Sequence, residues 1–249
     1  IFDTRLNSSG MDITEKDNLT KISSKLKSFE GELIDASSIY NGRDQSNSST
    51  VKVNSICNGF QLGSVTLDDP SLIIKCLEKS HTSKWEDTSA KERVRVLENI
   101  ANEIEKNPYE IIYFLINESG KTIQNAIDEI REGVDFLRYY SQEIIKISNN
   151  TNNLDGPTGE ENKISYSPKG RFLCISPWNF PVAILIGQIS AALVCGNRVI
   201  VKPSEHTSLL GYLIVQIFHQ FGIPKDALEL ILGDGSYGEI LTKTKSLQG

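Results

Sequence analysis

The sequence has no run of basic residues and no apolar segment long enough to span a membrane. Its 26 Lys and Arg stand against 32 Asp and Glu, and the formal net charge of −6 excludes the basic surface typical of nucleic-acid-binding proteins. The longest apolar stretch, residues 180–195, contains Gln188 and Ser190, and the first residues lack the regions of a signal peptide. We expect a cytoplasmic protein with no membrane or nucleic-acid partner, whose partner is a small molecule or another subunit.

Cysteine and histidine are also scarce. The chain has four Cys, none in a Cys-x-x-Cys pair, and three His, so neither a zinc site nor a disulfide framework is predicted. Hydrophobic residues make up 39% of the 249 residues, which is enough to bury one or two cores. The composition therefore indicates a globular protein and excludes disorder throughout.

Residues 1–50 form a polar connector with one predicted amphipathic helix. Thr14 is a candidate N-cap, and the apolar residues that follow it recur at helical spacing. Residues 40–50 are almost wholly polar and are interpreted as a linker or mobile loop. The apolar face of the helix consists of Leu19, Ile22, Leu26 and Phe29.

Residues 51–149 are predicted to be mainly helical. Asp69 and Pro70 form an N-cap and N1 pair, and Ser89 with Glu92 forms a capping box before a second helix. A third helix is expected between residues 107 and 120, where glycine is a natural end. The fourth and longest helix has an apolar stripe of Ile123, Ala126, Ile127, Ile130, Val134, Leu137, Tyr140 and Ile144.

From residue 150 the pattern changes. Residues 150–170 are predicted to be a loop followed by a strand through Ile164 and Tyr166. Residues 171–249 then alternate short apolar strands with apolar helices, which is typical of a doubly wound parallel sheet. Ligands in such sheets bind at the carboxyl ends of the strands. The strands are expected at 171–176, 198–202 and 228–232, and the helices at 181–195, from Thr207 to Gly222, and from near Ser236.

The third strand end, residues 233–238, matches G-x-G-x-x-G between a strand and a helix. Helix amides there could contact a phosphate. The motif follows the third strand rather than the first, however, and the acidic residue expected about twenty positions later would lie beyond residue 249. A glycine-rich turn with no ligand is an equally good interpretation.

The second strand end carries Lys202 and Glu205 on a turn stiffened by Pro203. An ammonium donor and a carboxylate acceptor could together hold the two hydroxyls of a ribose. The carboxylate would repel a 2′-phosphate, which favours NAD over NADP. The alternative is a solvated ion pair at a surface turn.

The first strand end holds Asn179 between two prolines, Pro177 and Pro181. Pro181 is expected at position N1 of the apolar helix, which would leave Asn179 on stiff backbone at the mouth of the sheet. A fixed amide is a good donor to a developing oxyanion. The alternative is that Asn179 caps the helix.

Five segments of residues 171–249 resemble the aldehyde dehydrogenase superfamily in order and in spacing: ISPWNFP at 175–181, CGN at 195–197, VIVKPSEHT at 199–207, FGIP at 221–224 and LILGDG at 230–235. The resemblance implies the first half of an NAD-binding domain, an incomplete Rossmann-like parallel sheet preceded by a mainly helical segment, in an α/β fold.

The resemblance also implies roles for individual residues. Asn179 would be the oxyanion-hole amide. Lys202 and Glu205 would grip the adenosine ribose of NAD. The remaining implied cofactor neighbours are Ile175, Ser176, Pro177, Trp178, Ser204, Gly233 and Gly235, the two glycines lying on the adenosine side rather than forming a phosphate cradle.

A narrower resemblance covers residues 5–13, 118–122 and 129–140. These are similar to the dehydrogenase module of bifunctional proline-utilisation flavoproteins. The implied reaction is NAD-dependent oxidation of L-glutamate γ-semialdehyde, the open form of 1-pyrroline-5-carboxylate, to glutamate in proline catabolism. The residues themselves indicate only a C′ glycine and a core-facing aromatic stripe.

The catalytic Cys and Glu motifs of this family come later than Gly249, and none of the four cysteines lies in the nucleophile's motif. Cys174 and Cys195 are expected to be buried and inert. We therefore expect a fragment, inactive alone, that works with the missing portion of the same enzyme. The alternative is the non-catalytic product of a broken gene, at most an NAD-binding or subunit-interaction module. Residues 164–170 resemble the family's oligomerisation arm, which implies a homo-oligomer, and an incomplete sheet implies low stability.

Overall fold

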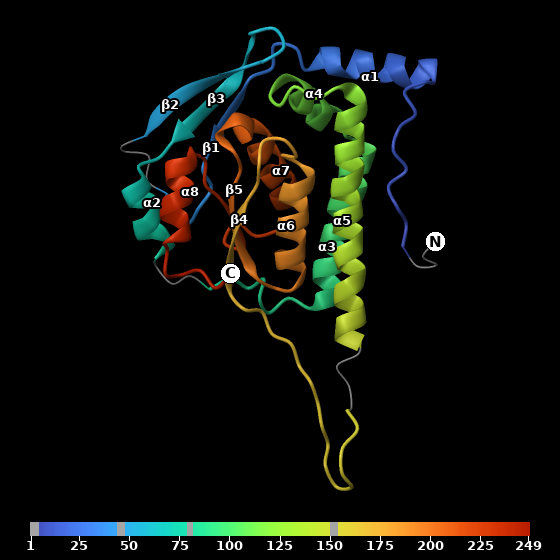
Figure 1. Cartoon of the computed structure of the whole chain (residues 1–249), viewed down its shortest axis with the longest axis vertical. Coiled ribbons are helices and arrows are strands. Elements are labelled where there is room, and N and C mark those ends of the chain that lie inside the picture. The colour runs from blue at the N-terminus through green and yellow to red at the C-terminus, as the bar shows by residue number, and fades with distance from the viewer. Residues whose placement is uncertain (1–4, 44–47, 79–81, 150–153) are drawn as a thin grey trace.

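Figure 1 shows the computed structural model, which describes residues 5–43, 48–78, 82–149 and 154–249. Its centre is a parallel sheet in the order β4-β5-β6. The strands are β4 (Arg171–Ile175), β5 (Arg198–Lys202) and β6 (Leu228–Leu230), so the third strand is two residues shorter than expected. The predicted parallel α/β sheet is confirmed.

Helices cover both faces of this sheet (Figure 1). Helices α6 (Ala183–Val194) and α7 (Ser208–Gln220) pack with Val199 and Val201 in the larger apolar core. On the other face, α8 (Gly235–Thr242) and α2 (Pro70–Leu77) join Ile200 in a smaller cluster. Alternate residues of β5 therefore point into different cores, which is why its three central residues are all apolar.

Both edges of the sheet have backbone partners. The Ile39 and Leu230 backbones exchange two hydrogen bonds of 2.7 Å along β6. Along β4, the amide of Gln248 donates to the Arg171 carbonyl and that of Leu173 donates to the Gly249 carbonyl, each at 2.9 Å. The chain thus passes from β6 through α8 to the far side of β4. The strand order reverses at β4, where doubly wound sheets open a ligand crevice at the carboxyl end.

The helices before the sheet begin largely where their capping signals predict. In α3 (Ala90–Lys106) the capping box of Ser89 and Glu92 is present, and Asp69 caps α2 by accepting from the Ser71 amide at 2.8 Å. Three more helices are α1 (Lys16–Ser28), α4 (Tyr109–Asn117) and α5 (Ile123–Asn149). The predicted Thr14 cap is wrong: Glu15 is the N-cap of α1, while the Thr14 amide and hydroxyl bond Asp12.

A second sheet between residues 34 and 67 was not predicted: residues 51–149 were expected to be mainly helical, and two strands occupy their first part. Its strands are β1 (Ile34–Ser37), β2 (Ser49–Asn54) and β3 (Gln61–Leu67), in the order β1-β3-β2. Gly63 allows close pairing, because a Cβ there would overlap the Ile34 carbonyl. The predicted linker at 40–50 is also partly wrong, since Tyr40 is buried and Ser49 begins β2, and its residues 44–47 lie outside the described residues.

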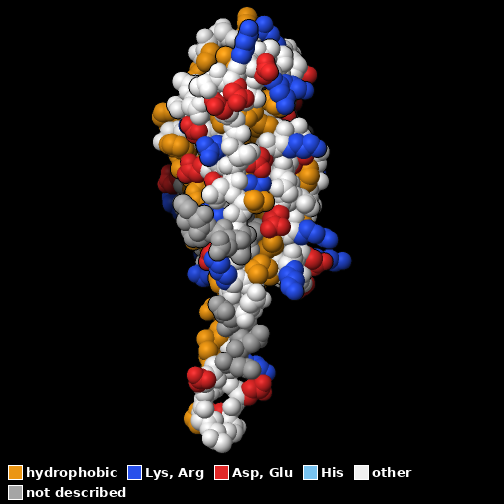
Figure 2. Space-filling view, turned by 90° about the vertical axis from the view of Figure 1, so that its right-hand side faces the viewer, with side chains coloured by type: hydrophobic (Ala, Val, Ile, Leu, Met, Phe, Trp, Pro, Cys, Tyr) orange, Lys and Arg blue, Asp and Glu red, His pale blue; other side chains and the backbone are white. Residues whose placement is uncertain are grey.

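Residues 154–170, called the arm here, project away from the body (Figure 1). Leu154 and Asn162 form a single bridge, and no strand forms at Ile164 or Tyr166, which corrects the prediction there. Both side chains are exposed. Figure 2 shows apolar side chains along the arm and mixed charges over the face above it. Residues 150–153 of the predicted loop lie outside the described residues.

No helix in the described ranges is both long enough and apolar enough to cross a membrane.

Candidate functional site

The loop after β4 presents apolar side chains at the carboxyl end of the sheet. Ile175 and Trp178 are 41% and 56% exposed, and Asn179 beside them is also exposed. Pro177 is half-buried, whereas Ser176 is buried and its amide donates to the Lys202 carbonyl at 3.2 Å. That bond ties the beginning of the first loop to the end of the neighbouring strand.

A distant carboxylate closes the other end of this loop. Glu129 Oε1, from α5, accepts from the amides of Val182 at 2.7 Å and Ala183 at 3.1 Å. Asn179 does not cap α6, so the capping alternative is wrong. Helix α6 begins at Ala183 with Val182 as its N-cap, so Pro181 is not at N1 as predicted.

Lys121 links that carboxylate to the loop. Its Nζ lies 2.8 Å from Glu129 Oε2 and 4.4 Å from the centre of the Phe180 ring. The Glu129 side chain is fully buried, which strengthens an ion pair relative to one on the surface. The backbone that follows Asn179 is therefore held at Phe180 and at the α6 amides, and the backbone before it is held at the Ser176 amide.

At the end of β5, Lys202 is buried and only 3% exposed. Its Nζ donates to the Pro203 carbonyl at 3.1 Å rather than to a carboxylate. Burial lowers the pKa of Lys202, while the nearby carboxylates of Glu205 and Asp234 raise it. The alternative of a solvated surface ion pair is therefore wrong. Glu205 itself is exposed, with Oε1 4.0 Å from His206 Nε2.

The remainder of this loop is locally ordered. The Ser204 hydroxyl accepts from the His206 amide at 3.3 Å and caps a short 3-10 turn, Glu205–Thr207. Thr207 is the N-cap of α7, as predicted, but its side chain makes no capping hydrogen bond. The hydroxyl of Ser204 is thus already engaged, while the Glu205 carboxylate faces solvent.

The capping oxygens for α7 come from Glu118. Its Oε1 and Oε2 accept from the amides of Leu209 and Leu210, each at 2.8 Å. Glu118 is 4% exposed, and burial raises its pKa to about 8 although the two amide bonds lower it. This residue ends α4 and reaches across to a helix ninety residues later in the chain.

The third strand end is arranged as a capped glycine turn. Asp234 Oδ1 accepts from the Ser236 amide at 2.9 Å and from its hydroxyl, and these bonds lower the Asp234 pKa. A carboxylate at this helix start disfavours a phosphate there. A Cβ at Gly233 would overlap the Tyr237 ring, whereas Gly235 is exposed with open space around it.

The cysteines lie away from these loops or are deeply buried. Burial raises the pKa of the Cys174 thiol, on β4, to about 12. Cys195 ends α6 at the opposite end of the sheet and is exposed, which corrects its expected burial. Cys57 and Cys76 donate to the carbonyls of Ile116 and Gly42.

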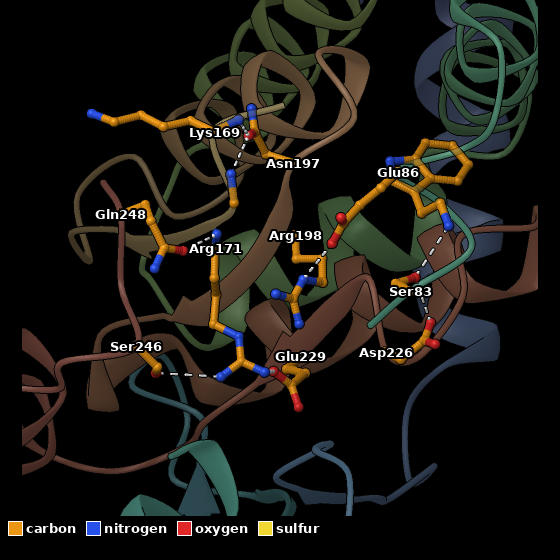
Figure 3. Close-up of polar contacts among 12 residues, drawn as sticks. Ser83, Glu86, Lys169, Arg171, Asn197, Arg198, Asp226, Glu229, Ser246 and Gln248 are labelled. Atoms are coloured by element: carbon orange, nitrogen blue, oxygen red, sulfur yellow. Dashed lines mark hydrogen bonds and ion pairs between the residues drawn. The ribbon is translucent and has the colours of Figure 1, made fainter. Parts of the chain in front are cut away.

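The opposite, amino end of the sheet is closed by polar partners (Figure 3). Arg171 Nη2 lies 3.3 Å from Glu229 Oε2, both side chains are buried, and Nη1 donates to the Leu77 carbonyl at 2.7 Å. Asn197 Oδ1 accepts from the amides of Lys169 at 2.7 Å and Gly170 at 3.0 Å. This end is built for packing rather than for a ligand.

The predicted site residues at the carboxyl end lie at the end of β4 and in the loop after it, and at the end of β5 and in the loop after that: Ile175, Ser176, Pro177, Trp178 and Asn179, and Lys202, Ser204 and Glu205. Sequence reasoning gave no role to Glu118, Lys121 and Glu129, although they lie in segments that resembled the family. In the sequence, Glu118 shortly before Gly120 looks like an ordinary helix end. The start of α7, about 90 residues later, carries no local sign that its amides bond to this residue.

Comparison with known proteins shows which family has this sequence. A family model described as the aldehyde dehydrogenase family matches residues 42–249. Bifunctional protein PutA of Salmonella typhimurium is 32% identical over 248 residues, which are 98% of this chain and 18% of that protein. The 1-pyrroline-5-carboxylate dehydrogenase of Staphylococcus epidermidis is 30% identical over 233 residues, which are 92% of this chain and 45% of that one.

A solved structure has the same fold. The 1-pyrroline-5-carboxylate dehydrogenase from Thermus with bound NAD matches with a TM-score of 0.87 at 23% identity, over 96% of this chain and 48% of that chain. The 249 residues thus span less than half the length of each of these three proteins.

Proposed function

The chain belongs to the aldehyde dehydrogenase family, and from this premise we propose that its parallel sheet binds NAD in an enzyme that oxidises L-glutamate γ-semialdehyde to glutamate. One relative is named 1-pyrroline-5-carboxylate dehydrogenase and the other bifunctional protein PutA. The first name supports this substrate, because L-glutamate γ-semialdehyde is the open form of 1-pyrroline-5-carboxylate. NAD accepts the hydride in such a reaction. The proposal places this step in proline catabolism.

The observation that carries the proposal is the exposed surface at the carboxyl end of β4. Exposed Ile175 and Trp178 lie at the carboxyl end where the strand order reverses, next to the end of β5. The Ser176 hydroxyl is buried there with no hydrogen-bond partner in the described part of the chain. An apolar surface with a few polar groups suits a nucleotide.

Each loop then has a proposed role. Lys202 donates to, and Glu205 accepts from, the hydroxyls of the adenosine ribose. Asn179 donates its amide to the oxyanion of the aldehyde carbon's tetrahedral intermediate. The other proposed cofactor contacts come from Ile175, Ser176, Pro177, Trp178, Ser204, Gly233 and Gly235.

We further propose that these 249 residues supply cofactor binding but not the nucleophile. Aldehyde oxidation by this route needs a thiolate beside the oxyanion donor. Cys174 is buried with a raised pKa, and Cys195 lies at the other end of α6. We propose that the arm contacts another subunit, because Leu154, Ile164 and Tyr166 are exposed on it. The cytoplasmic location stays a prediction.

Calorimetric titration with NAD tests the ribose role of Glu205. Glu205→Ala is expected to weaken NAD binding about tenfold, the value of one charge-assisted hydrogen bond. The variant should also lose part of its preference for NAD over NADP. Glu239→Ala is the matched control, because Glu239 is an exposed glutamate paired with Lys243 on α8. Equal NAD affinity in the parent and Glu205→Ala would contradict the proposed site.

A further inference from the structure

The two helices that follow the proposed cofactor loops lack caps of their own. Val182 and Thr207 are the N-cap residues of α6 and α7, and neither side chain makes a capping hydrogen bond. Both helices begin in the protein interior, where an unpaired amide is costly. Their amides must therefore be satisfied from elsewhere in the chain.

Two carboxylates from one corner of the helical part satisfy them. We call residues 118–129, from the end of α4 into α5, the α4–α5 corner. Glu118 accepts from two α7 amides at 2.8 Å, and Glu129 accepts from Val182 and Ala183 at 2.7 and 3.1 Å. Glu118 and Glu129 are 4% and 2% exposed.

These contacts act on the loops because the loops are short. Five residues separate the end of β5 at Lys202 from the start of α7 at Ser208, and seven separate the end of β4 at Ile175 from the start of α6 at Ala183. The sheet fixes the first end of each loop, partly through the bond from the Ser176 amide to the Lys202 carbonyl. Fixing the helix start then leaves the loop little freedom. A carboxylate at the helix start therefore sets where the loop residues stand.

The two carboxylates serve different loops. Glu118 holds α7, behind the loop with Lys202 and Glu205. Glu129 holds α6, behind the loop with Asn179, and its partner Lys121 lies over the Phe180 ring of that loop. The α4–α5 corner thus reaches both loops without contributing a side chain to the proposed nucleotide surface.

We propose that Glu118 and Glu129 are positioning residues, Glu118 for the ribose-binding loop and Glu129, with Lys121, for the loop that carries Asn179. The inference rests on the proposed function, which gives NAD as the ligand. In addition, the helical part of the chain would determine the geometry of a site formed by the loops of the sheet.

Binding of AMP and NAD to the full chain tests this division. Glu118→Gln keeps the size of the side chain but turns an NH2 group toward an amide donor, so α7 shifts and AMP affinity should fall about tenfold. Glu129→Gln should leave AMP affinity within twofold, because it acts on the other loop. Ser89→Ala, which removes the ordinary cap of α3, is the control for lost stability alone.

The comparison separates positioning from simple stabilisation. If Glu118→Gln, Glu129→Gln and Ser89→Ala weaken AMP binding in proportion to their loss of melting temperature, the two glutamates are only structural and the inference is wrong. If the parent chain binds AMP and NAD but Glu118→Gln binds AMP equally well, the inference is wrong while the proposed function stands.

Amide hydrogen exchange gives a readout that needs no ligand. Exchange in residues 203–210 should speed up in Glu118→Gln and not in Glu129→Gln, and the reverse should hold for residues 177–184. If the parent binds no nucleotide, the proposed function fails, and this exchange pattern still decides whether each glutamate holds its own loop. Equal exchange in both segments overturns the inference.

Lys121→Arg provides a second variant in case a glutamine variant does not fold. The Lys121 side chain is 14% exposed, and arginine keeps a cation beside the buried Glu129 carboxylate while changing the geometry of the contact with the Phe180 ring. It should speed exchange in residues 177–184 and alter the fluorescence of Trp178, which is exposed on that loop. No change in either measurement would contradict the assignment of Glu129 and Lys121 to the Asn179 loop.

Discussion

The two ends of the parallel sheet differ in where their polar groups find partners. At the amino end, Arg171, Glu229 and Asn197 are buried and bond groups beside them (Figure 3). At the carboxyl end, Asn179 and Glu205 are exposed, and their loops are held from behind. The amino end is closed by its own side chains, whereas the carboxyl end is left free for a ligand.

This difference explains why the helical part of the chain matters to the sheet. A cap supplied by a loop residue, such as Asn179, would tie that side chain to the helix start, because its oxygen would have to accept from the helix amides. Caps supplied by Glu118 and Glu129 satisfy the helix starts and leave the loop side chains available. Changes at the amino end should therefore alter stability, and changes at the carboxyl end should alter binding.

The largest expected effect is loss of the buried ion pair at the amino end. Arg171→Met leaves the buried Glu229 carboxylate without its guanidinium, and such a change typically costs about 3–5 kcal/mol in the free energy of unfolding. Chemical denaturation measures this cost. Lys243→Met, which breaks an exposed pair with Glu239, is the control and should cost less than about 0.5 kcal/mol. NAD affinity of the folded Arg171→Met chain should stay within twofold of the parent. A larger loss would contradict the view that the amino end of the sheet affects stability and the carboxyl end affects binding.

A second effect should appear in the pH dependence of stability. Burial raises the pKa of Glu118 from its ordinary value of 4.5 to about 8. Between these values the folded chain holds a proton that the unfolded chain has released, so the free energy of unfolding falls as pH rises from about 5 to about 8. Glu118→Gln cannot titrate and should lack this fall.

Melting temperatures of the parent and Glu118→Gln across this pH range measure the difference. His219, whose pKa is lowered by burial, acts in both chains and cancels in the comparison. Parallel profiles for the two chains would show that Glu118 does not titrate in this range, and that its amide bonds outweigh its burial.

Most of the sheet could be predicted from the sequence because its signals are local. Apolar runs mark β4 and β5, and the caps Asp69 and Ser89 lie within three residues of the amides they bond. The second sheet was missed although β2 and β3, of six and seven residues, are longer than β4 and β5, because β2 is largely exposed and no long apolar run marks it. Its pairing depends on contacts between β1 and β3, about 29 residues apart in register.

The start of α6 shows why the candidate site was harder to predict. Pro181 resembles an N1 residue, yet the helix starts later because Glu129 offers its carboxylate to Val182 and Ala183. This acceptor lies more than fifty positions earlier in the chain. The motif residues at the strand ends were found because their chemistry is local, while the residues that place them belong to other elements.

The smallest effect is expected for Asn179, and the contrast with Asn197 tests the comparison most directly. Asn197 is buried at the amino end, and its Oδ1 accepts from the amides of Lys169 and Gly170. Asn197→Ala leaves those amides unpaired and should cost about 1–3 kcal/mol. Asn179→Ala removes an exposed amide that caps no helix, so the free energy of unfolding should change by less than about 0.5 kcal/mol. Chemical denaturation of both variants measures the contrast. A cost at Asn179 equal to that at Asn197 would mean that this amide stabilises the fold, and it would then not be free to meet an oxyanion.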